Sequence, residues 1–261
     1  MLAGNAVLVW IIIGGHELCH LATARAAGAP ARMSLGTRLQ FLVAQTDVTG
    51  IWAESRRFRL TVYLYGITFN LLVASGCVWL KLLLSAGSIP YRLVGSAMVL
   101  TLLMVATQGL AFMRTDLYFV LQDLTRCTNL YTDAAAYLRF RARLLRRAIT
   151  RQPADRPRDP RTNLPAHQRP LIRNYAVILV VGTIGCLAVA LATTIPATIL
   201  LLRHAVDNVA ASESAGRLID GLSVTAITGA FWTVWARTWW RRHRQRLHWP
   251  LRRREVTRDD H

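Results

Sequence analysis

Cysteine is scarce in this 261-residue chain, and its placement excludes a disulfide framework. Four cysteines occur, at positions 19, 77, 127 and 186, with no paired spacing and each in or beside apolar sequence. Disulfide-stapled domains show an even set of cysteines at regular, close spacings. We therefore expect these four side chains to act as small buried hydrophobes. Internal repeats are also absent from the sequence, which argues against a repeat architecture.

Acidic residues are few: 14 Asp and Glu stand against 32 Lys and Arg, and the net charge is +18. In a soluble protein this excess would suggest nucleic acid as the partner. Here the arginines are concentrated in residues 139–173, which hold eleven, and in residues 237–261, which hold nine. Both clusters adjoin apolar runs, so cytoplasmic retention and contact with anionic lipid headgroups explain them better. We expect a lipid bilayer as a partner and no nucleic acid.

No basic region precedes the first apolar run, so a cleavable signal peptide is not expected. Long apolar runs, by contrast, are abundant, with 53% hydrophobic residues and a mean hydropathy of +0.29. A membrane-spanning helix needs about 20 mainly apolar residues. The sequence therefore predicts an all-α polytopic membrane protein with about five transmembrane helices. Their windows are residues 2–27, 58–84, 93–113, 171–202 and 218–235.

The positive-inside rule orients these spans. If both arginine clusters are cytoplasmic, the last two spans form a hairpin whose loop, residues 203–217, lies outside. The chain changes sides of the membrane at each earlier span. Loop 85–92 is therefore predicted outside, segment 28–57 in the cytoplasm and the amino terminus outside. The four arginines of segment 28–57 agree with this assignment. We predict a multi-pass protein of a cell membrane.

Segment 28–57 is too polar to span a membrane. Gly28 and Pro30 end the first helix, and residues 39–49, LQFLVAQTDVT, have strand-like composition. We predict a small hairpin at the membrane face between the first two spans.

The chain divides into four predicted segments. Residues 1–140 hold three spans and the polar motif described next. Residues 141–170 form a basic, Pro- and Arg-rich cytoplasmic linker, and the five prolines after position 150 favour an extended or disordered chain there. Residues 171–240 form a two-span helical hairpin, and residues 241–261 form a basic cytoplasmic tail.

The first apolar run contains an H-E-x-x-H motif, formed by His16, Glu17 and His20. Positions i and i+4 share one face of a helix, so both imidazoles can reach one metal ion while Glu17 lies beside it. An ionisable group inside a membrane costs about 2.5 kcal/mol or more and is functional by default. A hydrolytic zinc site takes three protein ligands and keeps one position for water. The motif therefore predicts a zinc site with Glu17 as general base.

A third ligand is required, and acids or histidines near the apolar runs are few. Asp116 lies closest to the end of the third run and is our predicted ligand. Asp123 follows seven residues later, near the same helical face, and we expect it to support the site or to lie at the headgroup level. Weaker candidates are Asp47, His167, His204 and Asp207.

Three stretches of residues 10–140 resemble the site-2 protease type of intramembrane zinc metalloprotease, most closely its bacterial branch of peptide zinc metalloproteases. They are HELCHLATARAAGA, TDVTGIWAESRRFRLTVYLYGITFN and FMRTDLYFVLQDLTRCTNLY. The first stretch is the most specific, and the residues after 140 show no resemblance.

The resemblance implies roles for individual residues. His16, His20 and Asp116 would bind Zn²⁺, and Glu17 would be the general base. Asn70, four residues after Gly66, would hold the substrate backbone or the developing oxyanion. A hydrogen bond between helices explains Asn70 equally well. The expected activity is a zinc metallopeptidase that cleaves a membrane-embedded or membrane-adjacent peptide in a bacterial cytoplasmic membrane.

Two other functions fit the same sequence. The family usually has Asn-Pro before the aspartate and Gly after it, whereas Asp116 stands in Arg-Thr-Asp-Leu. A catalytically weak or inactive relative, which binds membrane peptides within an export or immunity complex, is therefore an alternative. A transporter with a His/Glu proton relay is another. The substrate and the oligomeric state stay open.

Overall fold

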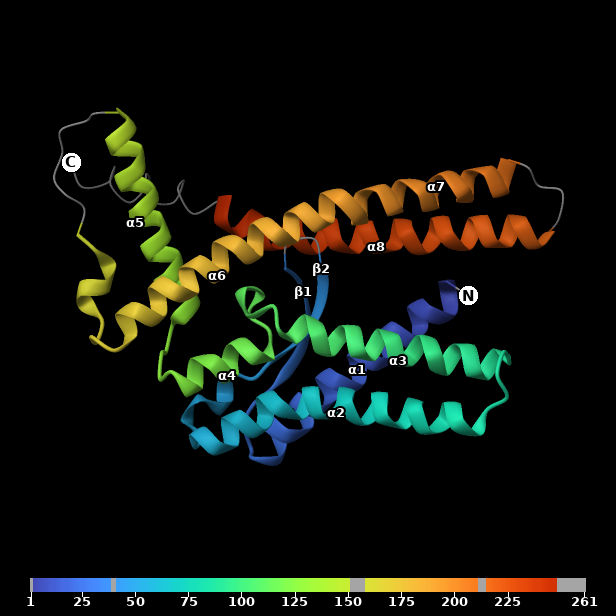
Figure 1. Cartoon of the computed structure of the whole chain (residues 1–261), viewed down its shortest axis with the longest axis horizontal. Coiled ribbons are helices and arrows are strands. Elements are labelled where there is room, and N and C mark those ends of the chain that lie inside the picture. The colour runs from blue at the N-terminus through green and yellow to red at the C-terminus, as the bar shows by residue number, and fades with distance from the viewer. Residues whose placement is uncertain (1, 39–40, 151–157, 211–214, 248–261) are drawn as a thin grey trace, which may run out of the picture.

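The computed structural model describes residues 2–38, 41–150, 158–210 and 215–247, and these are predominantly helical (Figure 1). α2, α3, α6, α7 and α8 run roughly along the longest axis, α1 runs obliquely and α5 stands across it, and a small two-stranded sheet lies between the helices. In chain order the elements are α1 (Leu2–Ala26), β1 (Arg32–Arg38), β2 (Phe41–Asp47), η1 (Thr49–Ala53), α2 (Arg56–Leu83), α3 (Ile89–Gln108), η2 (Ala111–Met113), α4 (Asp116–Leu124), α5 (Leu130–Thr150), η3 (Pro160–Asn163), α6 (Gln168–Val189), η4 (Ala190–Thr194), α7 (Ile195–Ala210) and α8 (Ala215–Leu247).

Among the described residues, four helical segments are long and apolar enough to cross a membrane. The fifth predicted span, residues 218–235, lies within α8, which is not one of them. Its apolar residues are diluted by glycine, serine and threonine. The composition of the other segments fits a membrane protein, while the count of five spans stays a prediction. The four segments are Gly4–Ala26, Arg56–Leu83, Ile89–Gln108 and Gln168–Ala210.

Local chemistry sets the start of two of these helices. Ser55 caps α2 by accepting a hydrogen bond from the backbone N–H of Phe58, and Ser88 caps α3 by accepting one from Tyr91. Such caps satisfy backbone donors that have no partner within the helix. α2 packs against α1, α3 and α4, and the side chains that converge at the site come from α1 and α4.

The fourth predicted span, residues 171–202, is part of a longer rod. α6, the π-helical turn η4 and α7 run continuously over Gln168–Ala210. Pro196 lacks a backbone N–H and its ring clashes with the carbonyl four residues earlier, so a wider turn just before it relieves the clash. α8 then returns alongside α7 and reaches β1.

The strands β1 and β2 form an antiparallel ladder between α1 and α2. Arg32 pairs with Asp47 at one end, and Arg38 pairs with Phe41 at the other. β2 lies within the stretch of strand-like composition at residues 39–49, although residues 39 and 40 lie outside the described part of the chain. β2 packs against α1, and β1 packs against α8. The position of this hairpin relative to a membrane face stays a prediction.

The third helix ends earlier than the sequence predicts. The apolar run extends to residue 113, but α3 stops at Gln108 and the chain turns through η2. Arg114 follows in the left-handed conformation, with φ +59°. Asp116 is consequently the first residue of the separate short helix α4, and this change of direction brings its side chain back toward α1.

The predicted linker is shorter than residues 141–170. α5 continues to Thr150, and η3 and the start of α6 occupy part of the remainder. Leu138, Leu145 and Ile149 recur at helical spacing among the arginines, so an amphipathic helix accounts for residues 141–150 better than a linker. Residues 151–157 of the linker and 248–261 of the predicted tail lie outside the described part of the chain.

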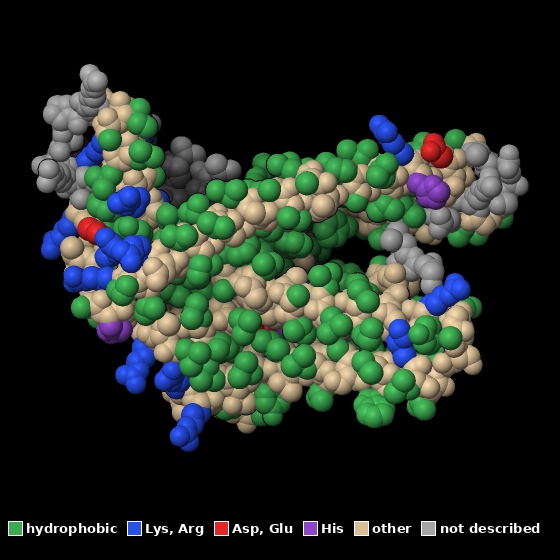
Figure 2. Space-filling model, in the orientation of Figure 1, with side chains coloured by type: hydrophobic (Ala, Val, Ile, Leu, Met, Phe, Trp, Pro, Cys, Tyr) green, Lys and Arg blue, Asp and Glu red, His purple; other side chains and the backbone are tan. Residues whose placement is uncertain are grey.

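Two buried clusters hold the helices together. One joins α4, α5 and α6 through Tyr118, Leu130, Ile172 and their neighbours. The other joins α1, η1 and the start of α2. Hydrophobic side chains also cover the outer faces of α2, α3 and α6–α7, while Lys and Arg gather toward the ends of the rods (Figure 2). Apolar outer faces between charged ends fit helices that contact lipid.

Candidate metal centre

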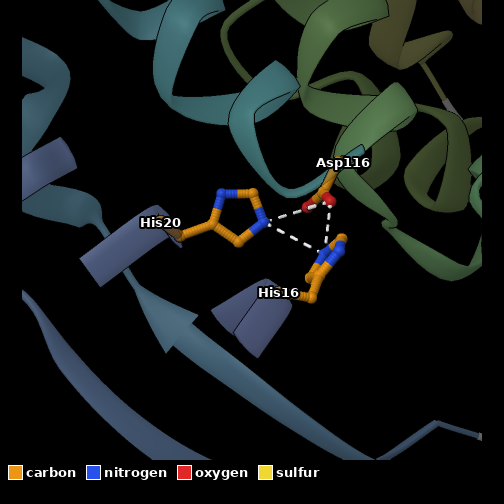
Figure 3. A group of neighbouring side chains, drawn as sticks. All are labelled: His16, His20 and Asp116. Carbon is orange, nitrogen blue, oxygen red and sulfur yellow. Dashed lines mark hydrogen bonds and ion pairs between the residues drawn. The ribbon is translucent and has the colours of Figure 1, made fainter. Parts of the chain in front are cut away.

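Three side chains from two distant segments converge on one point (Figure 3). His16 and His20 project from the same face of α1, and Asp116 reaches them from the first turn of α4. Oδ2 of Asp116 lies 3.0 Å from Nε2 of His16 and 3.2 Å from Nε2 of His20, and the two nitrogens are 3.2 Å apart. His16 and His20 are 3% and 5% exposed. This is a group of side chains that could hold a metal ion.

The dimensions of this triangle fit a small divalent cation. Zinc with ligands at about 2.0–2.1 Å in a tetrahedron separates neighbouring ligand atoms by about 3.3 Å. The observed separations of 3.0–3.2 Å are close to that value. Two imidazoles and a carboxylate also match the ligand chemistry of catalytic zinc sites.

His20 is held in the orientation that a metal ligand requires. Its Nδ1 lies 2.8 Å from the carbonyl oxygen of Val62 on α2 and donates to it. With its proton on Nδ1 alone, a neutral ring would direct the lone pair of Nε2 toward the triangle, where a bound metal ion would replace the hydrogen bond to Asp116. A hydrogen bond at Nδ1 fixes both the tautomer and the ring orientation of a metal-binding histidine.

His16 receives its orientation from Asn70, also on α2. The amide nitrogen of Asn70 lies 3.1 Å from Nδ1 of His16, and the residue is fully buried. Asn70 Oδ1 has no hydrogen-bond partner among the described residues. If the amide turns over, Oδ1 accepts from a protonated Nδ1, and Nε2 is then free to bind a metal. The hydrogen bond between helices is the observed role of Asn70, and its contact with substrate or an oxyanion stays a prediction.

Gly66 creates the space for both imidazoles. A Cβ at this position would lie 2.5 Å from Nε2 of His20 and 2.6 Å from Cε1 of His16. On α1, a Cβ at Gly15, the residue before His16, would overlap the ring of Phe69. By contrast, a Cβ at Gly14 meets nothing. Two glycines on facing helices therefore allow α1 and α2 to approach closely at the site.

Asp116 is positioned by the loop that leaves α3. Its backbone N–H donates to Oε1 of Gln108 over 3.1 Å, and the Thr115 hydroxyl donates to the Gln108 carbonyl over 2.7 Å. Burial alone would raise the pKa of the Asp116 carboxyl, but its hydrogen bonds with His16 and His20 outweigh this effect and lower the pKa below its usual range. The carboxylate is therefore the favoured form.

Glu17 lies beside the triangle and contacts the hairpin. Its Oε2 accepts a hydrogen bond of 2.7 Å from the hydroxyl of Thr46 on β2. The same hydroxyl lies 3.1 Å from the Glu17 carbonyl oxygen. Glu17 is 9% exposed, and it is not among the three converging ligands. The hydrogen bond from Thr46 engages Oε2 of Glu17.

Asp123 does not reach the metal centre. Its two carboxylate oxygens accept hydrogen bonds of 2.9 Å from Nε and Nη2 of Arg59, so it ties α4 to α2. This pairing supports the position of α4, about two turns after Asp116. Within the described residues, the converging group is His16, His20 and Asp116. It does not include the weaker sequence candidates Asp47, His167, His204 and Asp207.

Sequence patterns alone did not indicate Thr46, Gln108 or the carbonyl of Val62. Each contacts the site through the tertiary fold, and none belongs to a motif with a fixed spacing from His16. The strand-like composition around Thr46 predicts a strand, but it gives no sign that this strand faces Glu17.

In the described part of the chain, the fold and site define a predominantly helical protein with four segments long and apolar enough to cross a membrane and a His/His/Asp group whose two histidines are buried. Comparison of the chain with protein-family models, with curated proteins and with solved structures found no match. The chemistry of the site therefore rests on its own residues and geometry.

Proposed function

We propose that this chain is a zinc metallopeptidase of the site-2 protease type, which cleaves a membrane-embedded or membrane-adjacent peptide. The observation that carries the proposal is the convergence of His16, His20 and Asp116, with Glu17 next to them in the motif. His16, His20 and Asp116 would hold the zinc ion. The resemblance of HELCH and its companion stretches to that family supports the same assignment.

In this proposal Glu17 is the general base. A bound zinc ion would act as a Lewis acid that polarises the substrate carbonyl and lowers the pKa of water to about 7. Glu17 takes a proton from the attacking water as the new C–O bond forms, and it returns that proton to the amide nitrogen as the C–N bond breaks. Because Thr46 occupies Oε2, we assign the proton transfer to Oε1.

The substrate must present an exposed peptide carbonyl, which a hydrogen-bonded helix does not. β2 carries Thr46 and lies against α1, so an unwound substrate segment that adds beside this hairpin would reach the site. The arginine distribution supports a cytoplasmic position for the hairpin, and a bacterial cytoplasmic membrane is part of this proposal. Five spans with both arginine-rich segments inside are part of this proposal.

Metal content and proteolysis of purified variants test the proposal. We expect about one zinc ion per chain in the wild-type protein and in Glu17→Gln, measured by plasma mass spectrometry. His16→Ala, His20→Ala and Asp116→Ala should lose it. The exposed residues His204 and Asp207 on α7 offer matched controls, and His204→Ala and Asp207→Ala should keep zinc.

Cleavage of casein, a disordered chain with exposed peptide groups, gives the second measurement. Wild-type protein in detergent should cleave it, and Glu17→Gln or a zinc chelator should abolish cleavage. Wild-type protein without zinc would overturn the proposal. Zinc binding without cleavage, together with peptide binding that survives Glu17→Gln, would favour the non-catalytic relative. Proton transport in liposomes that survives chelation would favour the transporter.

A further inference from the structure

A cavity of about 960 Å³ adjoins the metal centre on the side of the hairpin. Its walls come from β1 and β2, from the turn η2 and α4, from the start of α5 and from α6 and α8. Thr46 is one of the lining residues, and its hydroxyl is bonded to Glu17. Arg114 is another, two residues before Asp116. The cavity therefore shares one wall with the general base and another with the proposed third ligand.

The charges that line this cavity are unequal. Among its lining residues Arg38 and Arg114 are basic, and Asp47 is the acid. Oδ1 of Asp47 accepts a hydrogen bond of 3.0 Å from the backbone N–H of Thr49, at the start of η1. The cavity consequently presents more positive than negative charge to a bound chain.

Arg38 and Arg114 differ in how they are held. Arg38 donates through Nη1 to the Arg114 carbonyl over 2.6 Å and through Nη2 to Oε1 of Gln45. The Arg114 guanidinium lies 6.0 Å from the ring centre of Tyr118 and 5.7 Å from that of Tyr131. It makes no ion pair with any acidic side chain in the described part of the chain. A guanidinium supported on two rings, with its donors unused by an acid, is suited to bind a carboxylate.

The remaining walls suit an extended peptide. Trp52, Phe112, Phe119 and Trp239 supply aromatic faces, and Gln122 and Asn129 supply amide donors and acceptors. Apolar faces with a few placed polar groups are typical of ligand cavities, and this volume is within their usual range of about 300–1,000 Å³. A peptide segment has both kinds of group, and its chain could continue past Thr46 to Glu17.

We propose that this cavity binds an acidic segment of the substrate peptide, with Arg114 as the main contact for a carboxylate side chain. The proposal rests on the proposed peptidase function, because it names the substrate class of that same site. Arg38 adds positive charge at the carbonyl of Arg114. The peptide bond to be cut then lies in the part of the substrate that extends beyond Thr46 toward the metal centre.

Binding of matched peptides to Glu17→Gln protein in neutral detergent tests this inference without requiring cleavage. The probes are short rhodamine-labelled peptides that carry glutamate, glutamine or lysine at the same positions, and fluorescence anisotropy measures their affinity. We expect the glutamate peptide to bind about three- to tenfold more tightly than the glutamine peptide, and the lysine peptide to bind most weakly. This comparison needs no change at Arg114.

Variants then locate the contact. Arg114→Gln should remove the glutamate preference, and Arg114→Glu should reverse it toward the lysine peptide. Arg203→Gln, at an exposed arginine on α7, changes the net charge equally and should leave the preference intact. Equal binding of the glutamate and glutamine peptides, or equal loss in Arg114→Gln and Arg203→Gln, would overturn the inference. Glutamate-specific binding by a chain that lacks zinc and cleavage would instead refute the peptidase and leave the acidic-peptide site standing.

Discussion

Gly66 is the residue that lets α2 approach both imidazoles. Gly66→Ala should lower zinc affinity by about 100-fold, because the new methyl group would lie within 2.7 Å of three ring atoms of His16 and His20. Alanine favours a helix over glycine by about 1 kcal/mol, so helix content should not fall. The measurements are zinc competition with a chromophoric chelator and circular dichroism.

Gly76 provides the matched control for this substitution. It lies on the same helix, and a Cβ there meets no atom within 4 Å. Gly76→Ala should therefore keep full zinc affinity. Equal zinc affinity in Gly66→Ala and Gly76→Ala would show that the imidazoles do not need the space at position 66.

Asn70 is predicted to act on metal binding through His16. Asn70→Leu removes every hydrogen bond to Nδ1 and should lower zinc affinity by about tenfold to 100-fold. Asn70→Asp keeps an acceptor for a protonated Nδ1 and should retain the zinc. If Asn70 acts only on the oxyanion, both variants would bind zinc as wild type does and lose cleavage alone.

At the scale of single residues, sequence reasoning finds the three converging side chains more readily than the groups that hold them. His16, Glu17 and His20 have a fixed helical spacing, and Asp116 is the acid nearest the end of an apolar run. Tertiary packing alone brings Gln108 and Val62 to the site. No local pattern marks these two residues. Every residue has a backbone carbonyl like the one that Val62 offers to His20, and the Gln108 side chain accepts from a backbone N–H eight residues away.

The β1–β2 hairpin contacts Glu17 through Thr46, next to the proposed ligand His16. Thr46→Val keeps the shape of the side chain and removes the donor to Glu17. We expect kcat/KM for casein to fall about tenfold with zinc content unchanged, because the carboxylate loses a hydrogen bond and with it a fixed orientation. Thr46→Ser should restore the rate. A drop in zinc content in Thr46→Val would show that the hairpin supports the ligands rather than the base.

Element boundaries show where hydropathy alone stops being informative. Residues 93–113 form one apolar run, yet the chain turns after Gln108 because the helix ends at Gly109 and Arg114 takes up a left-handed conformation. Residues 171–202 predict a single span, whereas the helical rod extends to Ala210 through a π-turn before Pro196. Hydropathy measures how apolar a run is, and it does not register a change of direction within the run.

At the scale of the whole molecule, the two halves are joined more closely than a linker between them suggests. The Tyr175 hydroxyl on α6 donates to the carbonyl of Ala111 over 3.0 Å, and Gly182 admits the ring of Phe112. Both contacts hold η2, the turn that leads to Asp116. α8 returns along α7 and packs against β1 and α1. The back half of the chain thus supports the loop and the hairpin that complete the site.

The orientation of the entire chain in the membrane is open to direct measurement. A membrane-impermeant maleimide should label single cysteines on one side only, in a background with the four native cysteines replaced by alanine. Ser85→Cys and Asp207→Cys, at the ends of α2 and α7, should react from outside intact cells. Arg143→Cys on α5 and Thr162→Cys on η3 should react only after permeabilisation, because the arginine-rich segments favour the cytoplasm. All four positions lie on exposed surface. Labelling of Arg143→Cys in intact cells would show that the orientation is the reverse of the predicted one. The hairpin, the cavity and the proposed peptide cleavage would then lie on the outer side.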